Sequence, residues 1–248
     1  MPPPPERRPG DGVCTSIIVP AYNEEANIEG VVKEALKALE ELGLSHEVLV
    51  GNDGSTDGTR AILDELAAGC PRVRVFHSTT NKGVARTCLA LYRQTLGDVV
   101  AFFPGDGQVR PGQIANLLKG KDLFDVVVGF RRDRQDPLHR RLNAWLWNGA
   151  TRLLFGLPVR DVDSVKLFPG DFIRSVPVQS ESPFMETEIL IRARGSGLRV
   201  GNVDVDHLPR TGGRNTGARP TVIVHALGEM MRFWIRQHSG GWRARTPQ

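Results

Sequence analysis

Short apolar runs alternate with helix-like segments through the first 130 residues of the chain. The runs cover residues 15–20, 47–50, 73–76, 99–103 and 126–129. Between them, apolar residues recur with helical spacing, as in the stretches 24–42 and 59–69. Strands that alternate with helices form parallel sheets covered by helices on both faces. We therefore predict an α/β fold with a mostly parallel central sheet.

The pattern becomes less regular after residue 130. It predicts helices over 138–155 and 186–194, strands over 162–168 and 198–206, and a final helix over 221–237. The last helix carries an apolar stripe of Ile223, Leu227, Met230, Met231 and Trp234. That stripe either packs on the body of the fold or lies on a membrane, with Arg232 and Arg236 beside it.

The positive charge of the chain is concentrated in its second half. The formal net charge of the 248 residues is +4, a mild excess that does not indicate a nucleic-acid partner. Residues 130–160 contain seven arginines and two acidic residues, and residues 207–248 contain seven arginines and one. Arginine binds phosphate through two parallel hydrogen bonds, so the second half favours a phosphate ligand.

Three cysteines without paired spacing argue against a disulfide framework or a zinc site. A reducing, cytoplasmic setting fits this composition best. Residues 1–13 are rich in proline and charge, lack the apolar core of a signal peptide, and are predicted to form a disordered arm. No run reaches the roughly 20 apolar residues of a membrane span. The sequence is compatible with a homo-oligomer and does not decide the point.

Each of the first four strands is followed by a loop of unusual composition. These loops are Pro20–Glu25, Asn52–Thr59, Asn81–Gly83 and Pro104–Gln108. In open α/β sheets, ligands bind at the carboxyl ends of the strands, where these loops would meet. The alternative is that they are ordinary turns, because Asp-Gly and Asn-Asp sequences are common turn formers.

The side chains of these loops suit different parts of a nucleotide. Pro20 and Tyr22 offer a flat wall for a base, whereas the two acids and two hydroxyls of the loop Asn52–Thr59 suit a ribose, a base edge or a phosphate. Lys82, at a helix start, suits a phosphate. Asp106, on a turn flanked by glycines, could hold a divalent metal that bridges a diphosphate. The competing interpretation for both of these last residues is an exposed cap or turn.

Taken in order, the four loops resemble those of the family 2 glycosyltransferases, which have the GT-A fold. The segments 163–168, 186–205 and 207–214 are also similar to that family, so the resemblance covers about residues 15–217. The nearest subgroup is that of dolichyl-phosphate mannose synthase and its bacterial polyprenyl-phosphate relatives. It implies a catalytic domain over 14–217, with a nucleotide-sugar half (14–130) and an acceptor half (131–217), followed by a helix and basic tail (218–248).

The resemblance also implies roles for individual residues. The residues expected to bind the nucleotide sugar are Pro20, Tyr22, Asn23, Glu24, Asp53, Lys82 and Asp106. The metal, Mg²⁺ or Mn²⁺, is expected on Asp106 and Gln108. The family usually has an Asp-x-Asp motif before this glutamine, and here Pro104 replaces the first aspartate. One carboxylate ligand is thereby lost, so metal affinity should fall.

The acceptor decides what chemistry the second half must provide. A hydroxyl acceptor needs a carboxylate base, for which Asp163, Glu186 and Glu188 are the candidates. A lipid phosphate has a second pKa of about 6 and needs cations rather than a base. The residues expected to bind that phosphate are Arg131, Arg140 and Arg210, and the predicted catalytic set is Asp106, Arg131, Asp163 and Glu186.

We predict an inverting enzyme that transfers a hexose from a nucleotide sugar to a polyprenyl (dolichyl or undecaprenyl) phosphate at the cytoplasmic face of the membrane, with peripheral membrane contact. A hydroxyl acceptor in a glycan, lipid or natural product is the first alternative. A sugar nucleotidyltransferase is disfavoured, because its glycine-rich loop after the first strand is absent. A non-catalytic nucleotide-sugar-binding subunit gains support from Pro104.

Overall fold

The computed structural model describes residues 15–132, 138–209 and 220–239, so the predicted arm and the end of the basic tail lie outside the described residues. A single seven-stranded sheet runs in the order β3-β2-β1-β4-β6-β5-β7. Its strands are β1 (Thr15–Ala21), β2 (His46–Asn52), β3 (Val73–His77), β4 (Val99–Phe102), β5 (Val126–Arg131), β6 (Lys166–Pro169) and β7 (Val200–Val205). The helices are α1 (Ile28–Glu41), α2 (Thr59–Gly69), α3 (Val84–Gln94), α4 (Ile114–Gly120), α5 (Leu138–Phe155), α6 (Gly170–Ser175), α7 (Phe184–Gly195) and α8 (Pro220–His238).

Parallel pairing dominates the sheet, as the alternation of strands and helices predicts. Of the strands in the described residues, only β6 runs antiparallel to its neighbours, β4 and β5. Because β6 lies between two strands of the first half, both halves of the chain share one sheet. The predicted strand 162–168 was too long, since residues 161–165 form a loop before β6. The reason is local: the Val162 N–H donates to Asn148 Oδ1 at 2.9 Å instead of to a strand.

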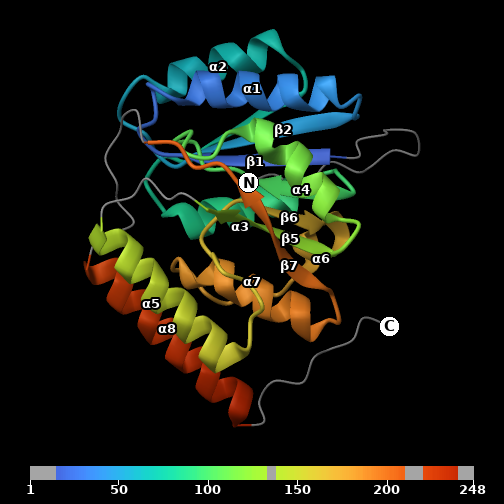
Figure 1. Ribbon diagram of the computed structural model, residues 1–248. Helices are drawn as coiled ribbons and strands as arrows, with labels where there is room; N and C mark the ends of the chain where they lie inside the picture. The colour runs from blue at the N-terminus through green and yellow to red at the C-terminus, as the bar shows by residue number, and fades with distance from the viewer. Residues whose placement is uncertain (1–14, 133–137, 210–219, 240–248) are drawn as a thin grey trace.

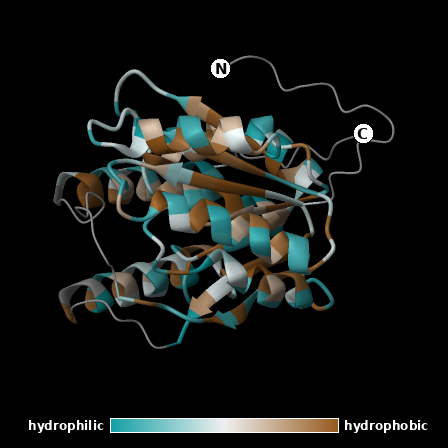
Figure 2. Cartoon of the chain, turned by 90° about the horizontal axis from the view of Figure 1, so that it is seen from above, coloured by the Kyte–Doolittle hydropathy of each residue, from teal (hydrophilic) through white to brown (hydrophobic). Residues whose placement is uncertain are grey.

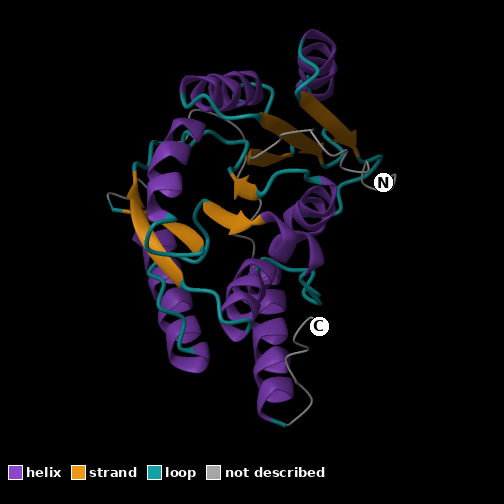
Figure 3. Cartoon of the chain, turned by 90° about the vertical axis from the view of Figure 1, so that its right-hand side faces the viewer, coloured by secondary structure: helices purple, strands orange, loops and turns teal. Residues whose placement is uncertain are grey.

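Helices cover both faces of the sheet (Figures 1 and 3). Alternation along β1 explains this, because Ile17 and Ile18 enter different hydrophobic clusters. The cluster around Ile17 joins the sheet to α1, α2 and α4, and the cluster around Ile18 joins it to α3, α6 and α7. Figure 2 shows largely hydrophobic strands between helices in which hydrophobic and hydrophilic residues are interspersed.

Two short helices, α4 and α6, are absent from the sequence prediction, because seven and six residues give too little periodicity to recognise. The first helix begins at Ile28 rather than at Glu24, since the Asn27 and Ile28 N–H groups both donate to Glu24 O in a preceding turn. The helix predicted over 186–194 starts two residues earlier, at Phe184.

The helices α5 and α8 lie side by side against α7 (Figure 1). Aromatic rings join the three helices: Phe184 of α7 contacts Trp147 and Phe155 of α5 and Phe233 of α8, at centroid distances of 5.7–6.3 Å. The packed face of the last helix consists of Ala226, Met230 and Phe233. The packing interpretation therefore holds for Met230 of the predicted stripe, whereas Leu227 and Met231 of that stripe are 41% and 44% exposed. Among the described residues, no helix is long and apolar enough to cross a membrane.

Candidate functional site

The polar loops meet at the carboxyl edge of the sheet. Three backbone hydrogen bonds join them there: Asp53 N donates to Ala21 O at 2.9 Å, Phe103 N to Ile18 O at 3.0 Å, and Gly105 N to Pro20 O at 3.3 Å. The antiparallel β6 begins at this same edge, with Lys166 opposite Phe102. The loop 161–165 of the second half is thereby brought to the loops of the first half.

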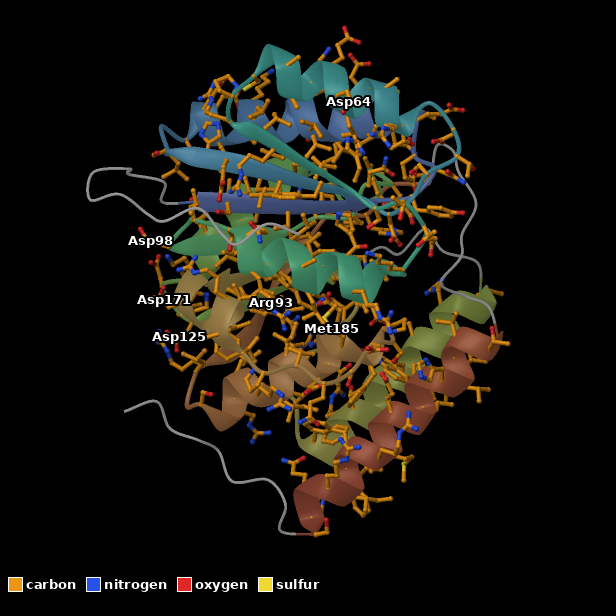
Figure 4. The ribbon with its side chains drawn as sticks, turned by 180° about the vertical axis from the view of Figure 1, so that it is seen from behind. Asp64, Arg93, Asp98, Asp125, Asp171 and Met185 are labelled. Atoms are coloured by element: carbon orange, nitrogen blue, oxygen red, sulfur yellow. The ribbon has the colours of Figure 1, made fainter. Side chains whose placement is uncertain are left out.

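A separate group of acidic residues lies at the other edge, where β4 and β5 begin. Figure 4 shows Asp98, Asp125 and Asp171 together there, far from the carboxyl ends of those strands. Asp125 is paired with Arg199 at 3.0 Å, and Asp171 forms an ion pair within α6 at 2.5 Å. These acids serve the fold and are not candidates for the site.

Asn23 ties the first loop to the second. Its backbone N–H donates to Ser55 Oγ at 3.0 Å, and its side-chain Oδ1 accepts from Thr56 N at 2.8 Å. Its φ of 55° lies in the left-handed region, which asparagine tolerates better than most residues. The structure thus gives Asn23 a role in shaping the predicted donor site, and its contact with a nucleotide stays a prediction.

The other predicted residues of the first loop differ in accessibility. Pro20 is buried within β1, whereas Tyr22 is half-buried in the loop that follows. Glu24 is 7% exposed, its N–H donates to Thr59 Oγ1 at 2.9 Å, and its Oε2 accepts from Asn27 Nδ2 at 2.8 Å. Of these three side chains, Tyr22 is the one that is best placed to meet a base.

Asp53 joins the second loop to the third. Its Oδ1 accepts from Lys82 N and its Oδ2 from Gly83 N, both at 2.8 Å, and the residue is only 4% exposed. The two loops also approach closely at Gly54, where a Cβ atom would lie 2.5 Å from the Thr80 carbonyl carbon. The side chain of Lys82 is exposed beside this junction. The carboxylate of Asp53 therefore sets the relative position of the two loops.

The side-chain amide of Asn52 joins the second loop to the end of β3. Its Oδ1 accepts from Ser55 N at 3.0 Å, and its Nδ2 lies 3.0 Å from His77 Nδ1. The other ring nitrogen of His77 is 2.9 Å from Asp64 Oδ1 on α2. An amide can accept from the loop and donate to the imidazole at once, whereas an ionised carboxylate can only accept.

Asp106 and Gln108 lie in a tight turn after β4. Asp106 Oδ1 accepts from Gln108 N at 3.1 Å, and Gly107 has a φ of 68°. Leu208, just after β7, donates its N–H to Gln108 O at 2.7 Å, so the second half closes over this turn. Within the described residues, no three His, Cys, Asp or Glu side chains converge as metal ligands. One carboxylate and one amide oxygen still suit Mg²⁺, which often takes its remaining ligands from substrate phosphates and water.

Arg131 ends β5 and faces Asp161. The guanidinium donates from Nε to Asp161 Oδ2 at 2.6 Å and from NH2 to Oδ1 at 2.8 Å, with both side chains largely buried. Arg131, the residue predicted to bind the acceptor phosphate, is therefore held in a fixed orientation by Asp161, which the sequence reasoning missed. Arg140 lies on α5 with a side chain outside the described residues, and Arg210 also lies outside them.

Asp163 reaches solvent at the carboxyl edge. Although the residue is exposed, the protein packed around its carboxylate removes part of its hydration; this desolvation, and then the negative charge of Asp161, raise the pKa of Asp163 above its usual value, while Lys166 and Arg131 oppose the shift. Within the described part of the chain, no hydrogen bond or ion pair joins this carboxylate to another group. Those properties suit a general base.

The two glutamates proposed as bases differ sharply. Glu188 is fully buried, accepts from Ser180 Oγ at 2.5 Å and pairs with Arg192 at 2.6 Å, so it is a structural residue. Glu186 lies in the first turn of α7, and its Oε2 lies 2.8 Å from the Lys166 Nζ atom. Lys166 was also missed, although a lysine inside an apolar strand is an available signal.

Comparisons with known proteins identify the family to which the chain is similar. A sequence model described as "Glycosyl transferase family 2" matches residues 16–167. Glycosyltransferase AglD of Haloferax volcanii is 30% identical over 222 residues, which are 84% of this chain and 36% of that protein. Undecaprenyl-phosphate mannosyltransferase of Micrococcus luteus is 26% identical over 92% of this chain and 97% of its own length.

Several other relatives are longer than the region they share with this chain. One is the undecaprenyl-phosphate 4-deoxy-4-formamido-L-arabinose transferase of Shewanella sediminis, of which 60% is matched at 29% identity. The chain thus spans between about one third and two thirds of the length of most of these relatives.

A similar fold occurs in glucosyl-3-phosphoglycerate synthase from Mycobacterium tuberculosis, with a TM-score of 0.65 at 22% identity over 94% of this chain and 86% of that one. Another structure of that synthase, with Mn²⁺, UDP-glucose and phosphoglyceric acid, has a TM-score of 0.66 at 21% identity over the same shares of the two chains. This likeness confirms the predicted GT-A fold. Together with the family match over residues 16–167, it leads to one conclusion: the chain belongs to glycosyl transferase family 2.

Proposed function

We propose that the chain is an inverting glycosyltransferase that transfers a hexose from a nucleoside diphosphate sugar to a polyprenyl phosphate. One observation carries the proposal: the loops of the first half and the segment 161–166 of the second half meet at one sheet edge. A donor and an acceptor could therefore bind side by side. The relatives named as undecaprenyl-phosphate transferases support the choice of acceptor.

The donor would lie across the loops that Asn23 and Asp53 hold together. Tyr22 would face the base, and the exposed Lys82 would approach the diphosphate. Asp106 and Gln108 would hold Mg²⁺ or Mn²⁺, whose positive charge stabilises the departing diphosphate. The loss of an acid at Pro104 makes the phosphates themselves a larger share of the ligand set.

The acceptor phosphate would bind near Arg131, with Arg140 and Arg210 as further candidates. Its oxygen is largely ionised at neutral pH, because the second pKa of a phosphate monoester is about 6. It can attack the anomeric carbon without a protein base. The pair between Arg131 and Asp161 fixes the direction of the guanidinium, so less side-chain freedom is lost on binding.

A hydroxyl acceptor remains the second candidate, because of one specific observation. Asp163 is exposed at the site edge with a raised pKa, which is what a base for a hydroxyl group requires. A phosphate acceptor gives this carboxylate no proton to remove. The two acceptors therefore predict different outcomes when Asp163 is replaced.

Membrane contact would bring such an enzyme to a lipid acceptor. Exposed large apolar residues lie on both α5 and α8: Leu138, Leu142, Trp145, Leu146, Leu153, Val224, Leu227, Met231 and Ile235. The sequence of α5 contains no acid, and Arg141 and Arg152 on it are exposed. Apolar side chains flanked by arginines suit an anionic lipid surface. We therefore extend the predicted contact from α8 alone to both helices.

The transfer itself is tested with radiolabelled GDP-mannose, UDP-glucose and related donors, Mg²⁺ or Mn²⁺, and liposomes that contain undecaprenyl phosphate. We expect label in the lipid phase that mild acid releases, as a glycosyl phosphate requires. A product that stays in water or resists acid would refute the phosphate acceptor. A wild-type protein inactive with every donor and metal would favour the non-catalytic binding subunit.

Flotation with phosphatidylglycerol vesicles tests the membrane contact separately. The variant Trp145→Ser/Ile235→Ser should float less than the wild type, because it removes one exposed apolar side chain from each helix. Leu123→Ser is the matched control, since Leu123 is 65% exposed but precedes β5, away from both helices. Equal flotation of all three proteins would exclude these helices as the membrane contact.

A further inference from the structure

Lys166 is a charged residue in the interior of the protein. It opens β6, is 0% exposed, and lies opposite Phe102 of β4 and Val128 of β5. Lysine is almost never fully buried unless its charge is paired, because removing an ammonium from water costs several kcal/mol. The position of this side chain therefore depends on the partners that surround its Nζ atom.

The ammonium has partners from three different segments. Its Nζ donates to Ser164 O at 2.8 Å, lies 2.8 Å from Glu186 Oε2, and is 5.5 Å from the centroid of the Phe102 ring. One atom thus connects the loop before β6, the first turn of α7 and the end of β4. In Figure 4, Met185, the neighbour of Glu186, lies beneath α3, and it belongs to the same hydrophobic cluster as the buried residues of that helix.

The loop held by Lys166 carries the acidic residues of the acceptor side. Ser164 directly follows Asp163, and Asp161 holds Arg131. Two backbone groups of this loop bond to neighbouring elements: Val165 O accepts from Gly129 N at 2.8 Å, and Val162 N donates to Asn148 Oδ1 of α5 at 2.9 Å. The bond from Lys166 Nζ to the Ser164 carbonyl is a further anchor of this loop, one residue from Asp163.

We propose that Lys166 is a positioning residue of the acceptor side, which holds Asp163 and the Arg131–Asp161 pair in place by joining the Ser164 carbonyl to Glu186. It does not touch the acceptor, because it is entirely buried. This inference rests on the proposed function for its effect on transfer. It goes beyond that function in assigning the placement of the acceptor residues to one internal cation.

The test compares Lys166→Met with Arg74→Met. Methionine keeps much of the side-chain length and removes the charge. Arg74 is the matched control: it pairs with the buried Glu47 at 2.7 Å, on β3 and β2, and lies away from the acceptor loop. We expect both variants to lose thermal stability, and only Lys166→Met to lose transfer, by about 10- to 100-fold in kcat.

The donor side should be spared in both variants. Binding of UDP and GDP with Mg²⁺, measured by calorimetry, and the KM for the donor should stay within about twofold of the wild type, because the loops of Asn23 and Asp53 do not depend on Lys166. The KM for undecaprenyl phosphate should rise in Lys166→Met alone. Equal losses of transfer in the two variants would show that Lys166 only stabilises the fold, and would overturn the proposal.

Hydrogen–deuterium exchange gives a readout that needs no activity. Peptides covering 160–166 and 182–188 should exchange faster in Lys166→Met than in the wild type. Their exchange rates should be the same in Arg74→Met as in the wild type. Unchanged exchange in both regions would refute the role of Lys166 in joining the Ser164 carbonyl to Glu186, even if the wild type proves inactive. Failure of the proposed function and failure of this inference are therefore distinguishable. If Lys166→Met fails to fold, Lys166→Met/Glu186→Gln removes both charges together, which buried pairs tolerate better, and the same two peptides are read.

Discussion

The replacement Asp53→Asn should lower the affinity of the donor site for a nucleotide, although it changes only one group of one side chain. Both carboxylate oxygens of Asp53 accept a backbone N–H at 2.8 Å, one from Lys82 and one from Gly83. Asparagine offers one oxygen and one NH₂ group, so one of these N–H groups would face another donor. A buried N–H that loses its acceptor costs about 1–3 kcal/mol. At about 1.4 kcal/mol for each factor of ten, affinity for a nucleotide held by both loops should fall roughly 5- to 150-fold.

Calorimetry with UDP and GDP in the presence of Mg²⁺ measures that affinity, and thermal unfolding measures stability. For a chain of this size, a loss of 1–3 kcal/mol lowers Tm by about 2–12 °C. The control is Asp171→Asn, which also neutralises an acid but at a side chain that is 99% exposed on the other edge of the sheet. Wild-type affinity and Tm in Asp53→Asn would refute the reasoning, because the hydrogen bonds would then contribute nothing to either.

Three further predictions concern charge. If the acceptor is a hydroxyl, the transfer rate should fall on acidification at a pH above the usual aspartate range, because the pKa of Asp163 is raised. The variant Asp163→Asn should then abolish transfer. If the acceptor is a phosphate, Asp163→Asn should keep most of the wild-type activity. Burial alone would raise the pKa of Asp57, but hydrogen bonds from the Thr59 side chain and backbone outweigh it, and the net pKa lies below the usual value. The stabilisation from this carboxylate is therefore present above the unfolded pKa and is lost on acidification. Between about pH 5 and pH 2, the Tm of Asp57→Asn should therefore fall less than the Tm of the wild type. Pro104→Asp should lower the Mg²⁺ concentration needed for half-maximal activity, since it adds a carboxylate two residues before Asp106; an unchanged metal titration would place the metal elsewhere.

The sequence predicts the sheet and the order of the loops well, because both depend on local patterns. Apolar runs of four to seven residues give the parallel strands, and their polar ends identify the loops that Asn23 and Asp53 later join. What these side chains do there is not local. The bonds from Asn23 to Ser55 and Thr56, and from Asp53 to Lys82 and Gly83, link positions about 30 residues apart, which no periodicity encodes.

The second half is harder to predict for a related reason. Its strand β6 has four residues and runs antiparallel, so its place between β4 and β5 depends on tertiary packing. The partners of its charged residues follow from that placement: Arg131 meets Asp161, and Lys166 meets Glu186. Sequence reasoning found Arg131 and Glu186 as candidates, but it could not find the residues that hold them.

The pairing of these charges bears directly on the choice of acceptor. At the acceptor edge, Asp161, Asp163 and Glu186 face Arg131 and Lys166, so two ion pairs form and the third acid, Asp163, stays outside them. A dianionic phosphate that approaches Arg131 would also approach Asp163, and like charges disfavour each other unless the acid is protonated. The pKa of Asp163 is raised because its surroundings disfavour the charged form, so the direction of this shift is compatible with a base and also with a neighbour of a phosphate. A pH profile alone therefore does not identify the acceptor. The combination of that profile with Asp163→Asn does, because removing the charge should leave or improve phosphate binding, whereas it should abolish transfer to a hydroxyl group.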